Sequence, residues 1–312
     1  MRQEYDSSIH LFPAIEPFDC GYFERDGHEI YYEQVGNPSG KVILFLHGGP
    51  GAGCSPAHRR LFDPKKFRAI LFDQRGSGRS KPYASTQKNT TQYLISDINY
   101  LREKLEIKKW TLFGGSWGST LALAYAIENP AFVSALILRG VFLGTGTEID
   151  WYLYEMGRFF PEAHDRFLSH IPIEERHDVL SAYHKRLTSA NHKIRNEAAK
   201  IFASYENSCA TLHAESRDAG QSAVSMAVLE AYYFMNDCFL PADYIVKNVQ
   251  YLKQLPCYIV QGRHDVICPP ASAYKLHKIW GHNSKLLLVD DAGHSAFEHG
   301  TLRNLMLFLQ TI

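Results

Sequence analysis

The sequence predicts an α/β protein built on a doubly wound, mostly parallel sheet with an inserted helical cap. Short apolar, strand-like runs alternate with segments of helical periodicity, which is typical of a parallel sheet covered by helices on both faces. The alternation stops once, for a long helix-rich stretch, and then resumes. With 312 residues and 45% hydrophobic content, the chain can bury a large core.

The elements of the alternating parts follow from their apolar runs. The predicted strands span residues 29–35, 42–47, 69–73, 110–113, 135–139, 256–261 and 285–289. The predicted helices span residues 91–105, 272–280 and 302–309. Asn89 or Thr90 is available as the N-cap of the first of these helices.

The middle of the chain, residues 142–249, lacks this alternation. Its clearest helices are residues 197–205 and 225–234. Doubly wound folds place their sites at the carboxyl edge of the sheet, so we interpret this stretch as a helical cap over that edge. Residues 1–141 and 250–312 then form the core. A separate second domain is disfavoured, because the α/β pattern resumes after the stretch.

Composition excludes several classes of function. The formal net charge is zero and no basic run stands out, so no nucleic-acid partner is predicted. No apolar stretch approaches the ~20 residues of a membrane helix, so no membrane partner is predicted. The six cysteines are scattered without a C-x-x-C pair, which indicates reduced thiols, a cytoplasmic location and no zinc site. No cofactor or metal is predicted, and the sequence does not indicate an oligomeric state.

Residues 114–119, Gly-Gly-Ser-Trp-Gly-Ser, are the most informative motif. They follow the predicted strand 110–113 and precede an apolar helical run, residues 120–126. A serine with glycine two residues away on either side, between strand and helix, is the nucleophile elbow of the α/β-hydrolase fold. The turn is so sharp that the serine is strained and side chains at the glycine positions would collide with neighbours. Ser116 is therefore the predicted nucleophile.

A serine nucleophile needs a histidine to take its proton and an acid to orient that histidine. In this fold the order along the chain is serine, acid, histidine. Asp265 follows one late strand and His294 follows the last strand, so these two residues are the predicted acid and base. Asp290 and Asp291 compete for the role of the acid, but they share a loop with the base and are better suited to shaping its turn.

The oxyanion formed on attack needs hydrogen-bond donors placed in advance. Residues 47–51, His-Gly-Gly-Pro-Gly, follow a predicted strand at the position where this fold supplies one backbone N–H. The residue after the nucleophile supplies the other. We assign these donors to Gly49 and Trp117. A phosphate-binding loop is excluded, because no Lys-Ser/Thr pair follows the glycines.

The combined motifs resemble those of the proline iminopeptidase (prolyl aminopeptidase) family. The resemblance rests on residues 47–51, 73–78, 114–119, 262–265 and 293–295 and extends from about residue 16 to residue 309. It implies a serine exopeptidase that removes N-terminal proline from peptides through an acyl-enzyme on its nucleophile. The implied partners are peptides that begin with proline.

The resemblance also implies two amine-binding glutamates in the cap, Glu206 and Glu230. An aminopeptidase must hold a cationic α-amine, and carboxylates in a partly dry pocket attract it. The chain departs from the family next to both residues: Tyr205 replaces a usual tryptophan, and Ala231-Tyr232 replaces a usual Asn-His pair. These departures concern the details of the pocket rather than the carboxylates.

By the same resemblance, the proline ring would lie in an apolar slot. Phe142, Tyr152 and Cys268 would line it, with Arg139 nearby at the end of its strand. Each of these residues would equally serve as part of the core. Glu298 matches a family acid whose role could be purely structural.

Two other functions compete with this interpretation. One is a cofactor-free esterase or amidase on the same fold, for which Glu206 and Glu230 have no evident use. The other is a hydrolase fold that has lost catalysis and serves as a binding protein. All members of the predicted triad and both oxyanion loops are present, which disfavours the second alternative. Dehalogenases and epoxide hydrolases are excluded, because they need an aspartate where Ser116 stands.

Overall fold

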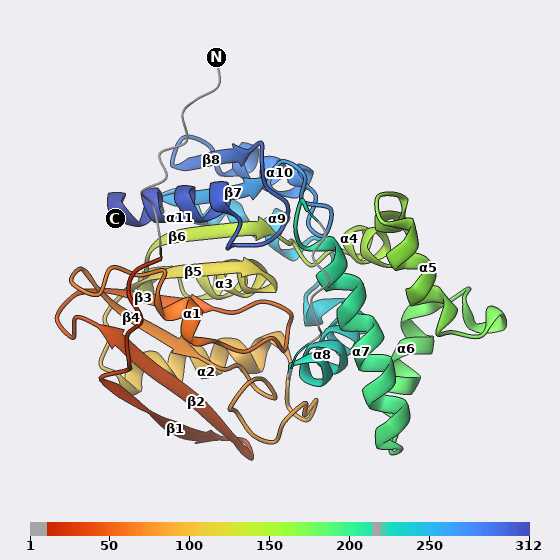
Figure 1. Cartoon of the computed structure of the whole chain (residues 1–312). Coiled ribbons are helices and arrows are strands. Elements are labelled where there is room, and N and C mark those ends of the chain that lie inside the picture. Colours follow the sequence, from red (N-terminus) through yellow and green to blue (C-terminus); the bar gives the residue numbers. More distant parts are fainter. Residues whose placement is uncertain (1–10, 214–219, 221) are drawn as a thin grey trace.

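The structure, a computed structural model, describes residues 11–213, 220 and 222–312. An 8-stranded sheet runs through it in the order β1-β2-β4-β3-β5-β6-β7-β8 (Figure 1). The strands are β1 (Asp19–Arg25), β2 (His28–Gly36), β3 (Lys41–Leu46), β4 (Phe67–Phe72), β5 (Trp110–Ser116), β6 (Val133–Val141), β7 (Cys257–Gly262) and β8 (Ser284–Val289). β1 pairs antiparallel with β2, and β2 pairs antiparallel with β4. The other neighbours are parallel, which confirms the mostly parallel sheet.

Helices cover both faces of this sheet. They are α1 (Pro56–Arg59), α2 (Thr91–Lys104), α3 (Trp117–Glu128), η1 (Pro130–Phe132), α10 (Pro270–Trp280) and α11 (His299–Thr311). Side chains of α2, α3 and α10 belong to one hydrophobic cluster and those of α11 to another. Because successive strand residues point to opposite faces, Leu44 joins the first cluster and Phe45 the second.

Between β6 and β7 the described chain forms helices and no strand. They are α4 (Gly146–Asp150), η2 (Trp151–Glu155), η3 (Met156–Arg158), α5 (Pro161–Ser169), η4 (Ile173–Glu175), α6 (Val179–Leu187), α7 (His192–Cys209), α8 (Ala223–Phe234), η5 (Asp237–Phe239), α9 (Tyr244–Asn248) and η6 (Val249–Leu252). In Figure 1, α4 to α8 stand beside the carboxyl ends of the parallel strands. α9 and η6 instead pack against α3, because Ile245, Val249 and Leu252 are buried in the core cluster.

One strand was missed by the pattern of the sequence, and one choice that the sequence left open is decided by the structure. β1 was not predicted, because it is an edge strand in which only Phe23 is buried and no apolar run marks it. At the start of α2 it is Thr90 that caps the helix, accepting a hydrogen bond from the Tyr93 amide. The side chain of Asn89 is engaged elsewhere and donates to the carbonyls of Arg75 and Ser85.

None of the described helices is both long and apolar enough to cross a membrane. The six cysteines are all free thiols. The cytoplasmic location expected from the sequence stays a prediction.

A buried ion pair beside the sheet makes a first prediction. The side chains of Arg75 and Asp97 are fully buried and joined by two hydrogen bonds of 2.6 Å. Asp97→Asn removes the fully buried counter-charge of Arg75 and leaves it only the partly exposed Asp26 at 2.8 Å, so we expect the free energy of unfolding to fall by about 3 kcal/mol. Glu29→Gln, which breaks an exposed 3.2 Å pair with Lys81, is the control and should cost less than about 1 kcal/mol. Denaturant unfolding measures both, and equal losses would contradict the argument.

Candidate active site

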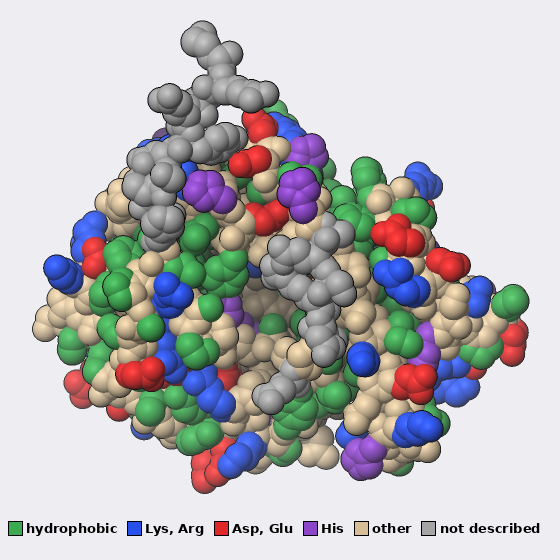
Figure 2. All heavy atoms as spheres, in the orientation of Figure 1, with side chains coloured by type: hydrophobic (Ala, Val, Ile, Leu, Met, Phe, Trp, Pro, Cys, Tyr) green, Lys and Arg blue, Asp and Glu red, His purple; other side chains and the backbone are tan. Residues whose placement is uncertain are grey.

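Ser116 ends β5 and is the N-cap of α3, with φ 57° and ψ −129°. This left-handed conformation is the strained turn expected of a nucleophile elbow. A Cβ on Gly118 would collide with the carbonyl of Leu46, and one on Gly114 with the carbonyl of Gly118, so only glycine lets the helix pack this close to the strands. Ser116 lines a cavity of about 250 Å³. Figure 2 shows the surface hollowed between the sheet-bearing part and the helices that follow β6.

Asp265 and His294 meet at the same edge of the sheet. The Nδ1 of His294 lies 2.8 Å from Oδ2 of Asp265. The carboxylate of Asp265 also accepts hydrogen bonds from Nε2 of Gln261 at 2.9 Å and from the Cys268 amide at 2.8 Å, and it is buried. Gly140 has φ 53° and lies against the His294 ring, where a Cβ would come within 2.8 Å. The carboxylate is therefore fixed in place and orients the imidazole.

The competing acids lie away from this pair. The side chain of Asp290 is 87% exposed and forms an ion pair with Arg263 at 3.5 Å. Asp291 is exposed as well, next to Gly300 at the start of α11. The geometry therefore places Asp265, rather than either neighbour in the loop, against His294.

The other ring nitrogen of His294 faces Arg139. Nη1 of Arg139 lies 3.0 Å from Nε2 of His294 and donates to the His294 carbonyl at 2.9 Å. An arginine can only donate, so Nε2 carries the lone pair and Nδ1 carries the hydrogen that faces Asp265. The Ser116 hydroxyl lies against the Cys268 thiol. Among the described residues, the free protein thus shows no hydrogen bond from Ser116 to His294.

Arg139 lies between the base and the elbow, and its expected place near the proline slot stays a prediction. Its guanidinium lies against Gly115, where a Cβ would overlap it. Burial lowers the pKa of Arg139, and the nearby carboxylates of Asp265 and Glu206 act in the opposite direction. Proton transfer from Ser116 to His294 requires this guanidinium to move.

The loop after β3 is anchored directly above the nucleophile. The Gln74 amide donates to Nε2 of His47 at 3.0 Å, and Nε2 of Gln74 donates to the His47 carbonyl at 2.9 Å. The indole of Trp117 donates to Oε1 of Gln74 at 2.9 Å. Burial lowers the pKa of His47, which keeps the ring a neutral acceptor. A Cβ on Gly48 would lie 3.4 Å from that of Ser116, so the loop and the elbow are in contact.

The two expected oxyanion donors flank this contact. Gly49 lies in the loop, and Trp117 is the first residue of α3, whose first amides have no partner within the helix. Their assignment as the oxyanion donors stays a prediction.

Glu206 on α7 and Glu230 on α8 form a buried carboxyl pair. The two side chains hydrogen-bond to each other. Burial raises the pKa of both carboxyls, and the charge of Glu206 raises that of Glu230 further. Oε2 of each glutamate and the hydroxyl of Tyr152 are buried without a hydrogen-bond partner in the described structure. Buried polar atoms are nearly always paired, and a ligand with several hydrogen-bond donors would suit these three atoms.

The residues expected to form the proline slot lie close to this pair but are closed off. The Phe142 and Tyr152 rings both pack against Phe234, with centroids 6.0 and 5.6 Å away. Cys268 lies beside Ser116. Phe142, Tyr152 and Cys268 are all buried and do not line the open cavity at Ser116. Their role as the slot stays a prediction.

The loop of His294 is held by the end of α7. The amides of His294 and Ser295 both donate to the carbonyl of Ala210, the C-cap of that helix, at 3.0 and 2.8 Å. Glu298 accepts from the Leu212 amide at 2.8 Å and from the Gly293 amide at 2.9 Å. Glu298 therefore joins the base loop to the cap segment, which is a structural role.

Two of these supporting residues were not identified from the sequence. Gln261 holds Asp265 and accepts a hydrogen bond from the Val141 amide at 2.9 Å. A polar residue near the end of a buried strand, four positions before the acid, is the signal that could have found it. Ala210 acts through its carbonyl alone, and no residue type marks such a role.

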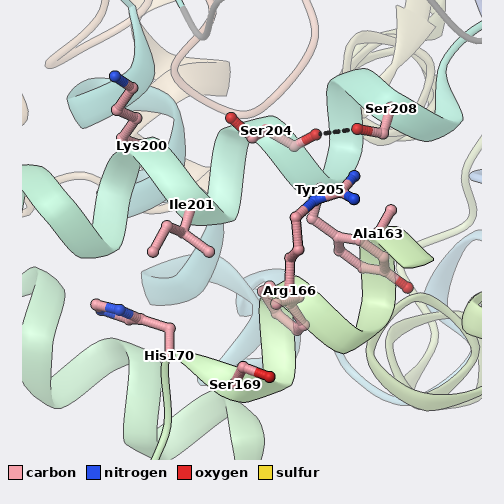
Figure 3. A pocket seen from close by; sticks show the side chains of 10 residues that line it. Ala163, Arg166, Ser169, His170, Lys200, Ile201, Ser204, Tyr205 and Ser208 are labelled. Atoms are coloured by element: carbon pink, nitrogen blue, oxygen red, sulfur yellow. Dashed lines mark hydrogen bonds between the residues drawn. The ribbon is translucent and has the colours of Figure 1, made fainter. Parts of the chain in front are cut away.

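A larger cavity of about 510 Å³ lies between α5 and α7 (Figure 3). Ser204 and Tyr205 line it, and the Ser208 hydroxyl donates to the Ser204 carbonyl there at 2.8 Å. Ser116, His294 and Glu206 do not line this cavity. The smaller cavity is thus the one that holds the reactive groups. No group of three or more His, Cys, Asp or Glu side chains in the described residues is arranged to hold a metal ion.

Comparison with known proteins identifies the family. The profile of the alpha/beta hydrolase fold matches residues 41–301. The chain is 45% identical to a proline iminopeptidase of Xylella fastidiosa, over 92% of this chain and 94% of that protein. It is 44% identical to a proline iminopeptidase of Arabidopsis thaliana, over 95% of this chain and 80% of that protein. The chain belongs to the proline iminopeptidase family.

Solved structures show the same fold at lower sequence identity. A probable hydrolytic enzyme from Pseudomonas aeruginosa has a TM-score of 0.63 and 20% identity, with 96% of each chain covered. An esterase from Exiguobacterium antarcticum has a TM-score of 0.56 and 19% identity, covering 91% of this chain and 97% of that one. These likenesses support the α/β-hydrolase fold of this proline iminopeptidase family member and carry no argument about its substrate.

The geometry of Ser116, His294 and Asp265 predicts how strongly a substitution of each residue lowers kcat. Ser116→Ala and His294→Ala should lower kcat for a phenyl acetate ester by about 10⁴ or more, because triad members act as a unit. Asp265→Asn should lower it by about 10³–10⁴, because the acid fixes the imidazole tautomer. Asp290→Asn is the matched control and should stay within about twofold of the unsubstituted protein. Ester hydrolysis and labelling with a fluorophosphonate measure these effects, and a severe loss in Asp290→Asn alone would reassign the acid.

Proposed function

We propose that this protein is a serine exopeptidase that releases N-terminal proline from peptides through an acyl-enzyme on Ser116. The observation that carries the proposal is the buried pair of Glu206 and Glu230 close to the nucleophile, with one unpartnered oxygen on each carboxyl. Relatives named proline iminopeptidase, at 42–47% identity, support it.

The carboxyl pair suits the amine of proline. Burial raises the pKa of both carboxyls, and the neighbouring Glu206 raises that of Glu230 further. Two neighbouring buried carboxyls share a proton when nothing else neutralises them. The secondary ammonium of an N-terminal proline has two N–H donors, and it can give one to each unpartnered oxygen. The incoming cation then replaces the shared proton, so both carboxyls ionise on binding. A neutral acyl group offers neither the charge nor the donors.

With the amine held there, the proline carbonyl reaches Ser116. His294 takes the hydroxyl proton at Nε2 once Arg139 has moved away, and Oγ forms a bond to the carbonyl carbon. The amides of Gly49 and Trp117 stabilise the oxyanion. His294 then gives the proton to the departing nitrogen as the peptide bond breaks. A water molecule then gives a proton to Nε2 of His294 and attacks the prolyl ester. The ester bond breaks, Ser116 regains its proton from His294, and proline is released.

A cofactor-free esterase or amidase is the alternative on this fold. It would use the same triad, so triad variants do not distinguish the two functions. The distinction lies in the amine, because only an aminopeptidase has a use for two buried carboxyls.

Removing either carboxylate tests the amine site. Glu206→Gln and Glu230→Gln should each lower kcat/KM for proline β-naphthylamide by about 10- to 150-fold, because a hydrogen bond to a charged group is worth about 1.5–3 kcal/mol. Hydrolysis of phenyl acetate, which has no amine, should change by less than about twofold. Glu197→Gln is the matched control, because Glu197 is an exposed glutamate on α7, the helix that carries Glu206. If N-acetylproline naphthylamide were cleaved as fast as the free amine, the aminopeptidase proposal would fail.

The same pair predicts a pH dependence. Burial raises the pKa of both carboxyls above the ordinary 4.5, so they take up protons at a higher pH than exposed glutamates as the pH falls. The ratio of kcat/KM for proline naphthylamide to that for phenyl acetate should therefore decline on acidification, with a midpoint above 4.5. The ratio cancels the ionisation of His294, which both substrates need. In Glu206→Gln the charge that raises the pKa of Glu230 is gone, and the midpoint should move to lower pH. A ratio that stays flat between about pH 5 and 8 would count against the carboxyl pair.

A further inference from the structure

The cavity at Ser116 continues past the reactive groups to a wall that the mechanism does not use. Its residues there are Phe45, His58, Leu61, Phe113, Ala296 and Phe297. Phe45, Leu61 and Phe113 belong to the hydrophobic cluster on the α11 face of the sheet. Phe142 and Tyr152, the expected slot for the proline ring, belong to the cluster on the other face. The two ends of a bound peptide would therefore point to opposite sides of the nucleophile.

The chemistry decides which end lies on which side. The amine of the substrate points to Glu206 and Glu230, whereas the departing nitrogen must reach His294 to receive its proton. The residue that follows the cleaved bond therefore lies beside the segment after His294. Residues 294–297 line the cavity one after another, so this part of the wall faces the leaving group.

Phe297, 37% exposed, is the accessible aromatic ring at this place, and His58 lies between Phe297 and Phe45 and supports it. The rings of His58 and Phe297 are stacked, with centroids 5.8 Å apart and planes at 20°. The other side of His58 is supported by Phe45, with centroids 4.7 Å apart. Nδ1 of His58 accepts a hydrogen bond from the Ser55 amide at 3.0 Å, so the neutral ring carries its hydrogen on Nε2. Burial lowers the pKa of His58 to about 4, and the ring is uncharged at neutral pH.

Among the described residues, the charged side chains that line the cavity lie at its catalytic end. The ionisable side chains that line it are Arg139, Glu206, His294, His47 and His58, and the carboxylate and guanidinium among them lie at the base and the amine site. No carboxylate, lysine or arginine side chain lies among the wall residues around His58 and Phe297 that the structure describes. A charged side chain placed here would lose water without gaining a partner, whereas an apolar one would not.

We propose that His58 and Phe297, together with Leu61, form a leaving-group subsite that takes an apolar, and best an aromatic, residue immediately after the N-terminal proline. The inference rests on the proposed function, because it needs a prolyl bond to be cleaved at Ser116. It adds to that function a preference for the side chain of the residue that follows the cleaved bond. Aromatic side chains stack favourably on an accessible ring such as that of Phe297 in offset or tilted arrangements.

The test is the kcat/KM of Pro-Phe-NH2, Pro-Gly-NH2 and Pro-Glu-NH2. The amides remove the terminal carboxylate, and kcat/KM reports acylation rather than the hydrolysis of the common prolyl-enzyme. For the unsubstituted protein, kcat/KM should be about tenfold or more higher for Pro-Phe-NH2 than for Pro-Gly-NH2, and it should be lowest for Pro-Glu-NH2. Phe297→Ala and His58→Ala should each lower the ratio of kcat/KM for Pro-Phe-NH2 to that for Pro-Gly-NH2 by about fivefold. Phe18→Ala, which truncates a 44% exposed phenylalanine next to β1, is the control for Phe297, itself 37% exposed.

A gain of function guards against a variant that merely folds poorly. Phe297→Arg places a cation at the subsite. It should raise the ratio of kcat/KM for Pro-Glu-NH2 to that for Pro-Phe-NH2 by about tenfold. If the unsubstituted protein cleaves all three peptides at the same rate, or if its preference for Phe survives in both Phe297→Ala and His58→Ala, the subsite is wrong and the exopeptidase proposal stands. If no prolyl peptide is cleaved although phenyl acetate is, the proposed function fails and the subsite fails with it.

Discussion

The last turn of α7 connects the proposed amine site to the loop of the proposed base, His294. Glu206 presents its carboxyl from this turn, and Ala210, four residues later, presents the carbonyl that holds the His294 and Ser295 amides at 3.0 and 2.8 Å. Four residues span about one helical turn, so the amine site and the base loop are fixed by one rigid element. Glu298 adds a second link between the same segments. A shift of α7 would therefore move the carboxyl pair and the base together.

The apolar residues around Glu206 and Glu230 allow the protein to keep two carboxyls buried side by side. Two carboxyls and the Tyr152 hydroxyl are buried here, and removing polar atoms from water is unfavourable. The large apolar cluster around them offsets this loss. In the proposed function the carboxyl pair selects the substrate, because a ligand with a positive charge and N–H donors compensates the buried carboxyls and an acyl group without an amine does not.

The sequence predicted those features that rest on local chemistry. The parallel strands, the glycine-flanked Ser116 and the positions of Asp265 and His294 after late strands all follow from patterns of a few residues. β1 escaped prediction because an exposed edge strand needs no apolar run. Gln261 and Ala210 escaped because their roles depend on which atoms a distant loop brings to them. No local signal encodes such a contact.

By itself the sequence therefore determined the fold, the order of the candidate catalytic residues and the family, since each depends on spacing along the chain. Only the tertiary structure decided that Asp265, rather than Asp290, meets His294 at 2.8 Å, and that Arg139 lies 3.0 Å from Nε2. It also decided that Glu206 and Glu230 hydrogen-bond to each other, although 23 residues separate them along the chain. The physical reason is that hydrogen bonds and charge interactions act over a few ångströms in space, and residues distant in sequence come within that range only when helices and strands pack.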